Sequence, residues 1–241
     1  MGVTAETGAP GTPIGRRVVL GMLGLGGAGV LLGSRIQDGI SSLLAPITAA
    51  DPSGITSLIP AAGRFRIYSA AGYLPRKAAG DYQLHVKGLV DKPATLSFAD
   101  LQAMAPTPLT KDFQCVTGWR VRGVKWIGVR LGDVLDAAGV QPKAKAITFT
   151  SFDGLYSESL TMTQARRPDV IVAYSMEGNA IPSRHGGPVR LYVAPMYGYK
   201  SCKWLDTIEV VDNVDPGYWE VRGYDTDAWI GRSNGRDDQP V

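Results

Sequence analysis

The sequence predicts an α+β domain that is largely β, with mixed sheets and short helices, and three observations support this fold class. Short runs rich in β-branched and aromatic residues recur between about residues 82 and 211, which is the pattern of strands. Between them lie only a few short segments with helix-capping residues. No glycine-rich phosphate loop joins a strand to a helix in this sequence, which disfavours a nucleotide-binding α/β fold. Such a pattern is typical of α+β and mainly-β domains.

The first half of the predicted domain alternates strands with short helices. We expect a strand over 82–90, and a helix that begins after Ser97 and ends near residue 104. A strand over 110–116 follows and delivers Cys115. The next predicted helix covers 129–138, with apolar residues on one face and Gly139 as its C-terminal cap.

The second half is predicted to contain mostly strands. Asp153-Gly154 lies between two apolar runs and predicts a hairpin. Thr161 and Gln164 have the spacing of a capping box and predict a short helix. The predicted strands of this half cover 146–152, 155–160, 170–175, 189–194 and 205–211.

Composition and charge limit the function. The chain has 241 residues, 44% of them hydrophobic and 20% charged, which suffices for a sizeable core. A net charge of +3, without a stripe of Lys or Arg, gives no indication of a nucleic-acid partner. Two cysteines and two histidines do not have the clustered spacing of a zinc site. A Cys115–Cys202 disulfide remains an alternative in an oxidising compartment.

The N-terminal part has the order of an export signal. Arg16-Arg17 precedes an uncharged run over 18–33, and paired arginines at this place indicate the twin-arginine route. We expect residues 1–34 to be a twin-arginine-type signal or a membrane anchor, 35–62 a linker and 63–241 the functional domain. A buried helix of the domain is an alternative for the apolar run. The predicted location is exported, periplasmic or extracytoplasmic, with or without anchoring to the membrane.

One candidate site lies around Cys115. The cysteine follows a strand-like run and precedes Thr117-Gly118, a turn signal whose glycine lets the backbone approach a ligand. A loop at the end of a strand can direct the sulfur into a cleft. The alternative is a buried structural thiol, since free cysteine behaves as a small hydrophobe.

A second candidate site is the basic stretch from His185 to Trp204. It contains Arg190, Lys200 and Lys203 around one predicted strand and one glycine turn. Arginine offers a planar fork of donors and lysine a point charge, and both suit a phosphate. The alternative is a solvated basic surface with a structural histidine.

Three motifs together carry a family resemblance. They are Cys115-x-Thr-Gly-Trp, His185-Gly-x-Pro-Val-Arg190 and Gly198-x-Lys-Ser-x-Lys-Trp204. In this order they resemble the molybdopterin-binding domain of the sulfite oxidase family. The resemblance includes its exported bacterial members related to the periplasmic methionine sulfoxide reductase catalytic subunit, and it covers roughly residues 64–224. It implies a sulfite-oxidase-type fold and the molybdenum-molybdopterin cofactor (Mo-MPT).

The resemblance also implies roles for individual residues. Cys115 becomes the molybdenum ligand, which agrees with the preference of soft metals for thiolate. Arg120 and Tyr224 match family residues beside the substrate. The positions that match pterin or phosphate contacts are Tyr68, Ser69, Ser151, Asp153, His185, Arg190, Ser201, Cys202 (through its backbone) and Lys203.

The resemblance leaves the substrate open. Animal and plant sulfite oxidases carry an Arg-Asn-His run where this chain has Arg66-Ile67-Tyr68-Ser69, and the methionine sulfoxide reductase branch often has Asn at the position of His185. We expect an exported mononuclear molybdenum oxidoreductase that performs two-electron oxygen-atom transfer on a small oxyanion or sulfoxide. Its expected electron partner is a separate membrane cytochrome or quinone-linked protein. The alternatives are a non-catalytic, membrane-tethered binding module of the same fold and a hydrolase with Cys115 as nucleophile.

Overall fold

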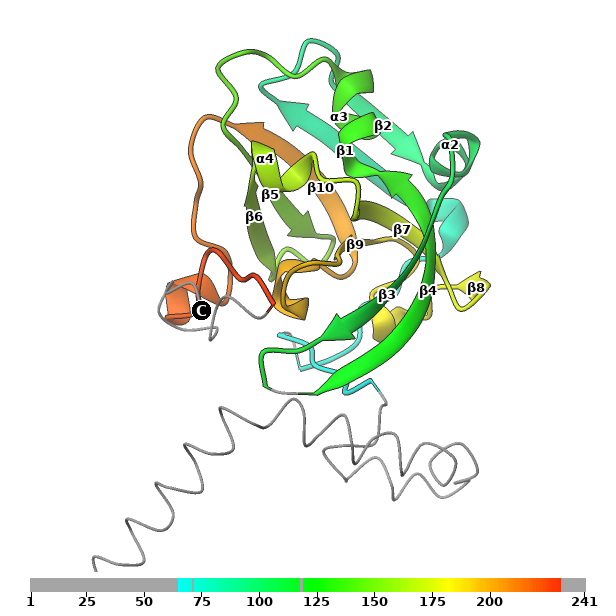
Figure 1. Ribbon diagram of the computed structural model, residues 1–241. Helices are drawn as coiled ribbons and strands as arrows, with labels where there is room; N and C mark the ends of the chain where they lie inside the picture. Colours follow the sequence, from blue (N-terminus) through cyan, green and yellow to red (C-terminus); the bar gives the residue numbers. More distant parts are fainter. Residues whose placement is uncertain (1–64, 71, 118, 231–241) are drawn as a thin grey trace, which may run out of the picture.

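Two five-stranded sheets form the framework of the protein in a computed structural model (Figure 1). The structure describes residues 65–70, 72–117 and 119–230. The predicted signal or anchor and the predicted linker lie outside these residues. The described part is built mainly of strands, with short helices between them, so the predicted fold class is confirmed. Within it, no helix is both long and apolar enough to cross a membrane.

The first sheet joins the two ends of the described chain. Its strand β1 pairs in parallel with β10, near the C-terminus, and His85 is opposite Thr207. All its other pairs are antiparallel. In spatial order the strands are β2 (Ala94–Ser97), β1 (Gln83–Gly88), β10 (Leu205–Val211), β5 (Ala146–Ser151) and β6 (Ser157–Thr161).

The second sheet is antiparallel throughout. Its strands β3 and β4 form a long curved pair that extends away from the first sheet in Figure 1. The next strand, β7, pairs with β4 along one edge and with β8 and β9 along the other. The bounds are β3 (Thr107–Gln114), β4 (Arg120–Arg130), β7 (Val170–Met176), β8 (Asn179–Ala180) and β9 (Arg190–Val193).

Three predicted helix caps are present in the structure. Ser97 forms a capping box with Asp100 at the start of α2 (Phe98–Ala103). Thr161 forms another with Gln164 at the start of α4 (Met162–Ala165). Gly139 ends α3 (Leu131–Ala138) with φ 69°. The short 3-10 turns are η2 (Ala79–Asp81), η3 (Ser183–His185), η4 (Gly198–Lys200) and η5 (Glu220–Arg222).

Strand β4 was not predicted, and its last residues, 129–130, were wrongly assigned to the following helix. Its first half alternates charged residues with others and includes Gly123, so it lacks an apolar run. Pairing with β3 and β7 on its two sides makes it a strand. The short strands β2 and β8 were also missed. The predicted strand 110–116 is shifted: β3 ends at Gln114, so Cys115 lies on the loop beyond it.

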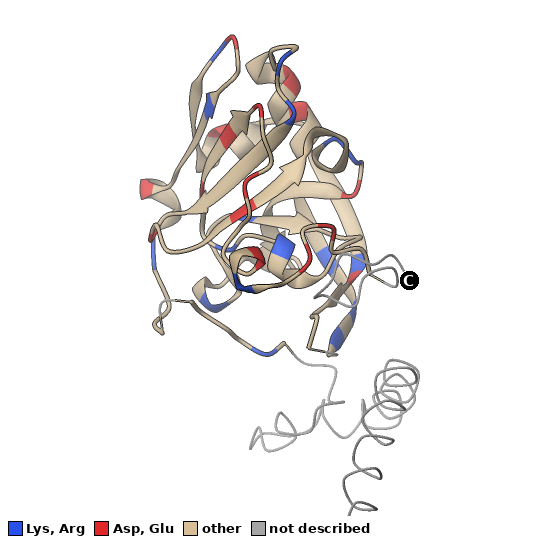
Figure 2. Cartoon of the chain, turned by 90° about the vertical axis from the view of Figure 1, so that its left-hand side faces the viewer, with Lys and Arg blue, Asp and Glu red and all other residues tan. Residues whose placement is uncertain are grey.

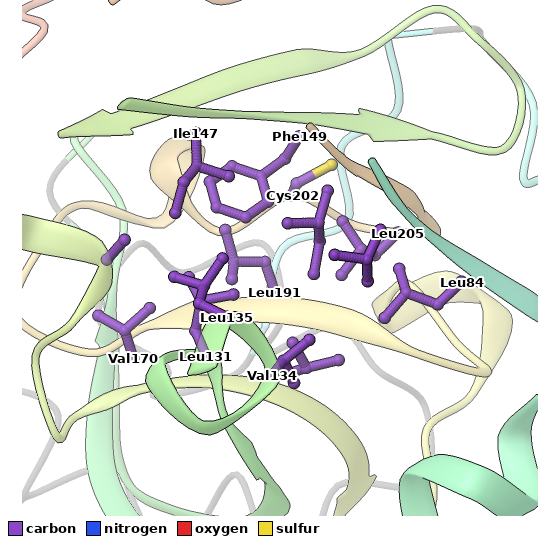
Figure 3. Packing of buried hydrophobic residues seen from close by; sticks show 14 of the residues in the cluster. Leu84, Leu131, Val134, Leu135, Ile147, Phe149, Val170, Leu191, Cys202 and Leu205 are labelled. Carbon is purple, nitrogen blue, oxygen red and sulfur yellow. The ribbon is translucent and has the colours of Figure 1, made fainter. Parts of the chain in front are cut away.

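The main core lies between the two sheets, with α3 as part of its filling. Figure 3 shows Leu131, Val134 and Leu135 of α3 directed into this core. Side chains of both sheets surround them, among them Leu84, Ile147, Phe149 and Leu205 from the first sheet and Val170 and Leu191 from the second.

Strand β7 of the second sheet is buried on both faces over most of its length. Along β7, Val170 and Val172 belong to the main core, whereas Ile171 and Ala173 belong to a smaller cluster on the opposite face. This alternation follows from the two-residue period of a strand, and it explains why β7 reads as a continuous apolar run. The smaller cluster contains stacked aromatic rings, with Trp126 and Tyr192 centroids 4.6 Å apart. It extends to Phe113 and Trp119, beside the candidate site.

Candidate functional site

A cavity of about 370 Å³ collects most of the predicted site residues. Its walls come from segments far apart in the chain: the opening segment 65–70, the loop after β3, the turn around η4 and the segment before η5. Of the predicted site residues, Tyr68, Ser69, Cys115, Asp153, His185, Arg190, Ser201, Lys203 and Tyr224 line it. Arg120, Ser151 and Cys202 do not line it.

Cys115 is half-buried on the loop that leaves β3. Its backbone N–H donates to the carbonyl of Trp119 at 2.9 Å, which closes the loop. The hydroxyl of Thr117 donates to Sγ at 3.2 Å. The glycine of this loop, Gly118, lies outside the described residues. The sulfur is therefore accessible from the cavity and already has one hydrogen-bond donor.

Cys202 differs from Cys115 in its burial and its surroundings. Its side chain is fully buried in the main core, and burial raises the pKa of its thiol. Both cysteines are free, so the disulfide alternative is wrong in this structure. The backbone carbonyl of Cys202 accepts from Leu191 N–H at 2.8 Å. A cofactor contact through its backbone stays a prediction.

Arg190 binds together the backbone segments on the basic side of the cavity. Its guanidinium is buried and donates to three backbone carbonyls: His185 at 2.6 Å, Ser201 at 3.0 Å and Leu191 at 3.2 Å. The hydroxyl of Ser201 in turn accepts from Val193 N–H at 2.9 Å. These bonds hold the loop that precedes β9 against the turn that follows it.

His185, Arg190 and Lys203 form a basic wall, and their electrostatics indicate an anion-binding site. Burial lowers the pKa of His185 to about 4, with Arg184, Arg190 and Lys203 adding to the effect. Burial also lowers the pKa of Lys203 to about 8, with Arg190 adding to it. Basic groups crowded in this way gain from a bound anion, because its charge offsets their mutual repulsion.

Two further segments complete the cofactor side. Asp153 accepts hydrogen bonds from the hydroxyl of Ser151 and, at 3.2 Å, from Leu155 N–H, which forms the predicted hairpin turn. The turn leaves Asp153 in the cavity wall and Ser151 behind it. On the other side, Lys203 donates to the carbonyl of Tyr68 and ties the opening segment to the basic wall.

The two predicted substrate residues are placed differently. Tyr224 lies in the cavity wall, with its ring centroid 5.5 Å from that of Tyr199 and 5.2 Å from that of Trp219. Arg120 instead directs its guanidinium to Gln114 at 3.0 Å and to Asp112 at 3.6 Å. Its role at the substrate stays a prediction.

An aromatic wall of the cavity was not foreseen. It consists of Tyr156, Tyr199, Tyr218 and Trp219, together with Tyr224. Tyr199 lies inside the motif Gly198-x-Lys-Ser-x-Lys-Trp204, and its place in this motif is the only indication of its role in the sequence. Tyr156 comes from a different segment than the adjacent Tyr218 and Trp219, and nothing in their spacing predicts that these segments meet.

Close backbone approaches at two glycines shape the wall of the cavity. A Cβ on Gly198 would lie 2.5 Å from the ring of Phe113, so only glycine allows this close approach. Gly186 adopts φ 97° beside Lys203. A thiol, a basic wall and aromatic planes around one cavity fit a flat, phosphate-bearing cofactor with a thiophilic metal.

Comparison with known proteins identifies that cofactor. Residues 71–219 match the family model of the oxidoreductase molybdopterin binding domain. The chain belongs to this family. The resemblance expected from the motifs is thereby confirmed, and molybdenum-molybdopterin is the cofactor of the domain. Membership sets aside the hydrolase alternative and favours an oxidoreductase over a non-catalytic module.

Individual relatives include both oxidising and reducing enzymes. The chain is 34% identical to the uncharacterized oxidoreductase YuiH of Bacillus subtilis, over 59% of this chain and 72% of that protein. It is 32% identical to the protein-methionine-sulfoxide reductase catalytic subunit MsrP of Ralstonia nicotianae, covering 58% of this chain and 46% of MsrP. Sulfite oxidase of Arabidopsis thaliana is 30% identical, with 59% and 45% covered.

A solved structure shows the same fold. It is the sulfane dehydrogenase SoxCD from Paracoccus pantotrophus, with a TM-score of 0.54 and 26% identity. The match covers 58% of this chain and 41% of that one. The chain thus spans about half the length of most of these relatives.

Proposed function

We propose that the protein performs two-electron oxygen-atom transfer on a small oxyanion or a sulfoxide. The bound molybdenum cofactor supplies the redox chemistry, and the protein holds and orients the reactants. One observation carries the proposal: a single cavity unites the Cys115 thiol, the basic wall and Tyr224 from segments that are far apart in the chain. Reduction of a sulfoxide takes up two electrons and two protons and releases water, and oxidation of an oxyanion reverses this balance.

On the cofactor side, we assign Cys115 as the molybdenum ligand. Lys203 and neutral His185 would hold the pterin and its phosphate, with Arg190 keeping both in place through the backbone. The remaining predicted cofactor contacts are those of Tyr68, Ser69, Ser151, Asp153, Ser201 and the backbone of Cys202.

On the substrate side, Tyr224 would donate a hydrogen bond to the oxygen of the substrate. Its position in the wall of the cavity supports this role. Arg120 would neutralise negative charge there after leaving its contacts with Asp112 and Gln114, so the structure supports it less directly.

We further propose that the protein works outside the cytoplasm with a separate electron partner. Arg16-Arg17 and the apolar run behind them support export of the folded, cofactor-loaded domain. The name of MsrP, a catalytic subunit, implies a further subunit in that enzyme. The proposed partner is a membrane cytochrome or a quinone-linked protein, and residues 18–33 would provide any membrane contact.

The test uses the full chain from a host that makes the cofactor, beside Cys115→Ser. We expect about one molybdenum per chain by mass spectrometry in the wild type, and loss or weaker retention in the variant, because a hydroxyl is a poor ligand for a soft metal. Turnover is measured with methionine sulfoxide and reduced viologen, and with sulfite and ferricyanide. Full metal-dependent turnover by Cys115→Ser contradicts the assignment, and a wild-type protein without molybdenum favours the binding module.

A further inference from the structure

A completely buried cluster of charged side chains lies behind the cavity. Lys200 is completely buried, and its ammonium contacts Glu158 Oε1 at 2.6 Å and Glu220 Oε1. The carboxylates of Glu158 and Glu220 are buried as well. None of the three side chains lines the cavity. We call Lys200, Glu158 and Glu220 the buried triad.

Each member of the buried triad follows an aromatic residue of the cavity wall. Lys200 comes directly after Tyr199 on η4, and Glu220 comes directly after Trp219 at the start of η5. Glu158 on β6 comes two residues after Tyr156. The triad therefore joins, from behind, the three segments that supply the aromatic wall.

The aromatic residues contact one another in a continuous series. The ring centroids of Tyr156 and Tyr218 are 5.4 Å apart, those of Tyr218 and Trp219 5.2 Å, and those of Trp219 and Tyr224 5.2 Å. Tyr199 closes the series at 5.5 Å from Tyr224. Because neighbouring rings touch, a shift of one segment displaces the others.

The segment 217–224, which carries Trp219 and Tyr224, is held to β6 close to Glu220. Gly217 N–H donates to Glu220 Oε2 at 2.6 Å, and Tyr218 N–H donates to Ser157 O at 2.9 Å. Further along, Val221 is 66% exposed and contributes little packing. The contact between Lys200 and Glu220 connects this segment to η4, and the hydrogen bond from the Tyr199 hydroxyl to Asp225 O at 2.7 Å is a second connection directly after the segment.

The charges of the buried triad are expensive for stability. A buried ion pair is often no more stabilising than apolar side chains of the same volume, so its presence indicates a need for a particular geometry. Two carboxylates also face a single ammonium. Burial raises the pKa of Glu158 to about 8, and Glu220 adds to the rise, so the triad is close to neutral when Glu158 holds a proton.

We propose that Lys200 and Glu220 are positioning residues that hold the aromatic wall, and with it Tyr224, against the cavity. They act through their neighbours and touch neither cofactor nor substrate. The proposal rests on the proposed function in one respect, the role of Tyr224 in turnover.

The first experiment measures the position of the segment without any turnover. Trypsin cleavage after Arg222 is followed by mass spectrometry in the cofactor-loaded full chain, in Glu220→Gln and in Glu158→Gln. Glu158→Gln replaces a carboxyl group that holds a proton at neutral pH and retains the charged contact between Lys200 and Glu220, whereas Glu220→Gln removes that contact. We expect cleavage about tenfold faster in Glu220→Gln, because losing one charged hydrogen bond favours local opening, and wild-type cleavage in Glu158→Gln. Equal cleavage rates in the two variants overturn the proposal.

The second experiment asks whether the triad acts through Tyr224. Glu220→Gln is combined with Tyr224→Phe, and kcat is measured per bound molybdenum. A positioning role predicts that Glu220→Gln lowers kcat in the wild type but has little further effect once the Tyr224 hydroxyl is gone. Equal effects in both backgrounds overturn the proposal. If no substrate is turned over, the proposed function fails, and the cleavage experiment still decides the positioning.

A second variant guards against misfolding. Lys200→Met combined with Glu220→Met replaces the charged contact with apolar side chains, which buried sites commonly tolerate. This variant should fold and bind molybdenum, yet show the same rapid cleavage after Arg222 and the same loss of kcat. Slow cleavage together with wild-type kcat in this variant overturns the proposal.

Discussion

The two sides of the cavity use positive charge in opposite ways. Lys203 belongs to the basic wall that faces the cavity, donates to the carbonyl of Tyr68 and lies over the ring of Trp204. Lys200, in the same motif, is turned away and buried between Glu158 and Glu220. The ammonium of Lys203 is available to a ligand in the cavity. The ammonium of Lys200 instead pairs with two buried carboxylates inside the protein. The residue type alone therefore does not distinguish a ligand contact from a positioning contact.

Figure 2 shows the wider setting of this contrast. Basic and acidic residues are interspersed over the described chain, without a continuous stripe of either sign. The difference between Lys200 and Lys203 therefore arises from their immediate neighbours, and comparing the two lysines tests the chemistry of the site alone.

Exchanging each lysine for methionine should give the largest effect. Lys200→Met leaves two buried carboxylates without their cation and should lower the free energy of unfolding by about 3–5 kcal/mol. Lys203→Met removes a partly desolvated charge and should change it by less than about 1 kcal/mol. Urea unfolding of the two cofactor-free variants measures both values.

The same variants should rank in the opposite order in cofactor binding. Lys203→Met loses a phosphate contact of about 1.5–3 kcal/mol, so it should retain less molybdenum than folded Lys200→Met. Equal losses of stability would show that both lysines are structural, and the contrast between the two walls would fail.

A smaller effect is expected where the backbone lies close to an aromatic ring. Gly198→Ala places a Cβ 2.5 Å from Phe113 and should destabilise the protein by about 1–3 kcal/mol, because the ring and η4 must move apart. Gly80→Ala is the matched control, since nothing lies within 4 Å of its added Cβ. Thermal unfolding should give a lower melting temperature for Gly198→Ala than for Gly80→Ala. Equal melting temperatures would mean that the Phe113 ring and η4 move apart without a cost in stability.

His185 of the basic wall and Glu158 of the buried triad give pH dependences of stability with opposite signs. The folded-state pKa of His185, about 4, is below its ordinary value of 6.5, so the folded protein binds fewer protons and its stability rises between pH 4 and 6.5. The folded-state pKa of Glu158, about 8, is above its ordinary value of 4.5, so the folded protein binds more protons and its stability falls between pH 4.5 and 8.

Variants separate these two contributions. His185→Gln should flatten the acidic side of the stability profile, and Glu158→Gln should flatten the falling side up to pH 8. Urea unfolding across this pH range in the cofactor-free protein provides the measurement. A falling side that persists unchanged in Glu158→Gln would assign it to another group.

Local patterns in the sequence determined many of the elements. Ser97 and Thr161 cap helices at the expected places, and Gly139 ends α3, because capping depends on residues within one turn of each other. The hairpin at Asp153-Gly154 is equally local. The three motifs indicated the family because each is a short segment of characteristic residues at fixed spacing, and the family model confirms it.

Only the tertiary structure decided the rest. Strand β4 exists because β3 and β7 pair with it, and no apolar run marks it in the sequence. The aromatic wall assembles from segments around Tyr156, Tyr199 and Tyr218, and the buried triad forms behind it for the same reason. The sequence by itself determined which chemistry the chain carries, since residue types and short spacings define it. Which lysine faces the ligand depends on burial, and burial is settled only when distant segments pack together.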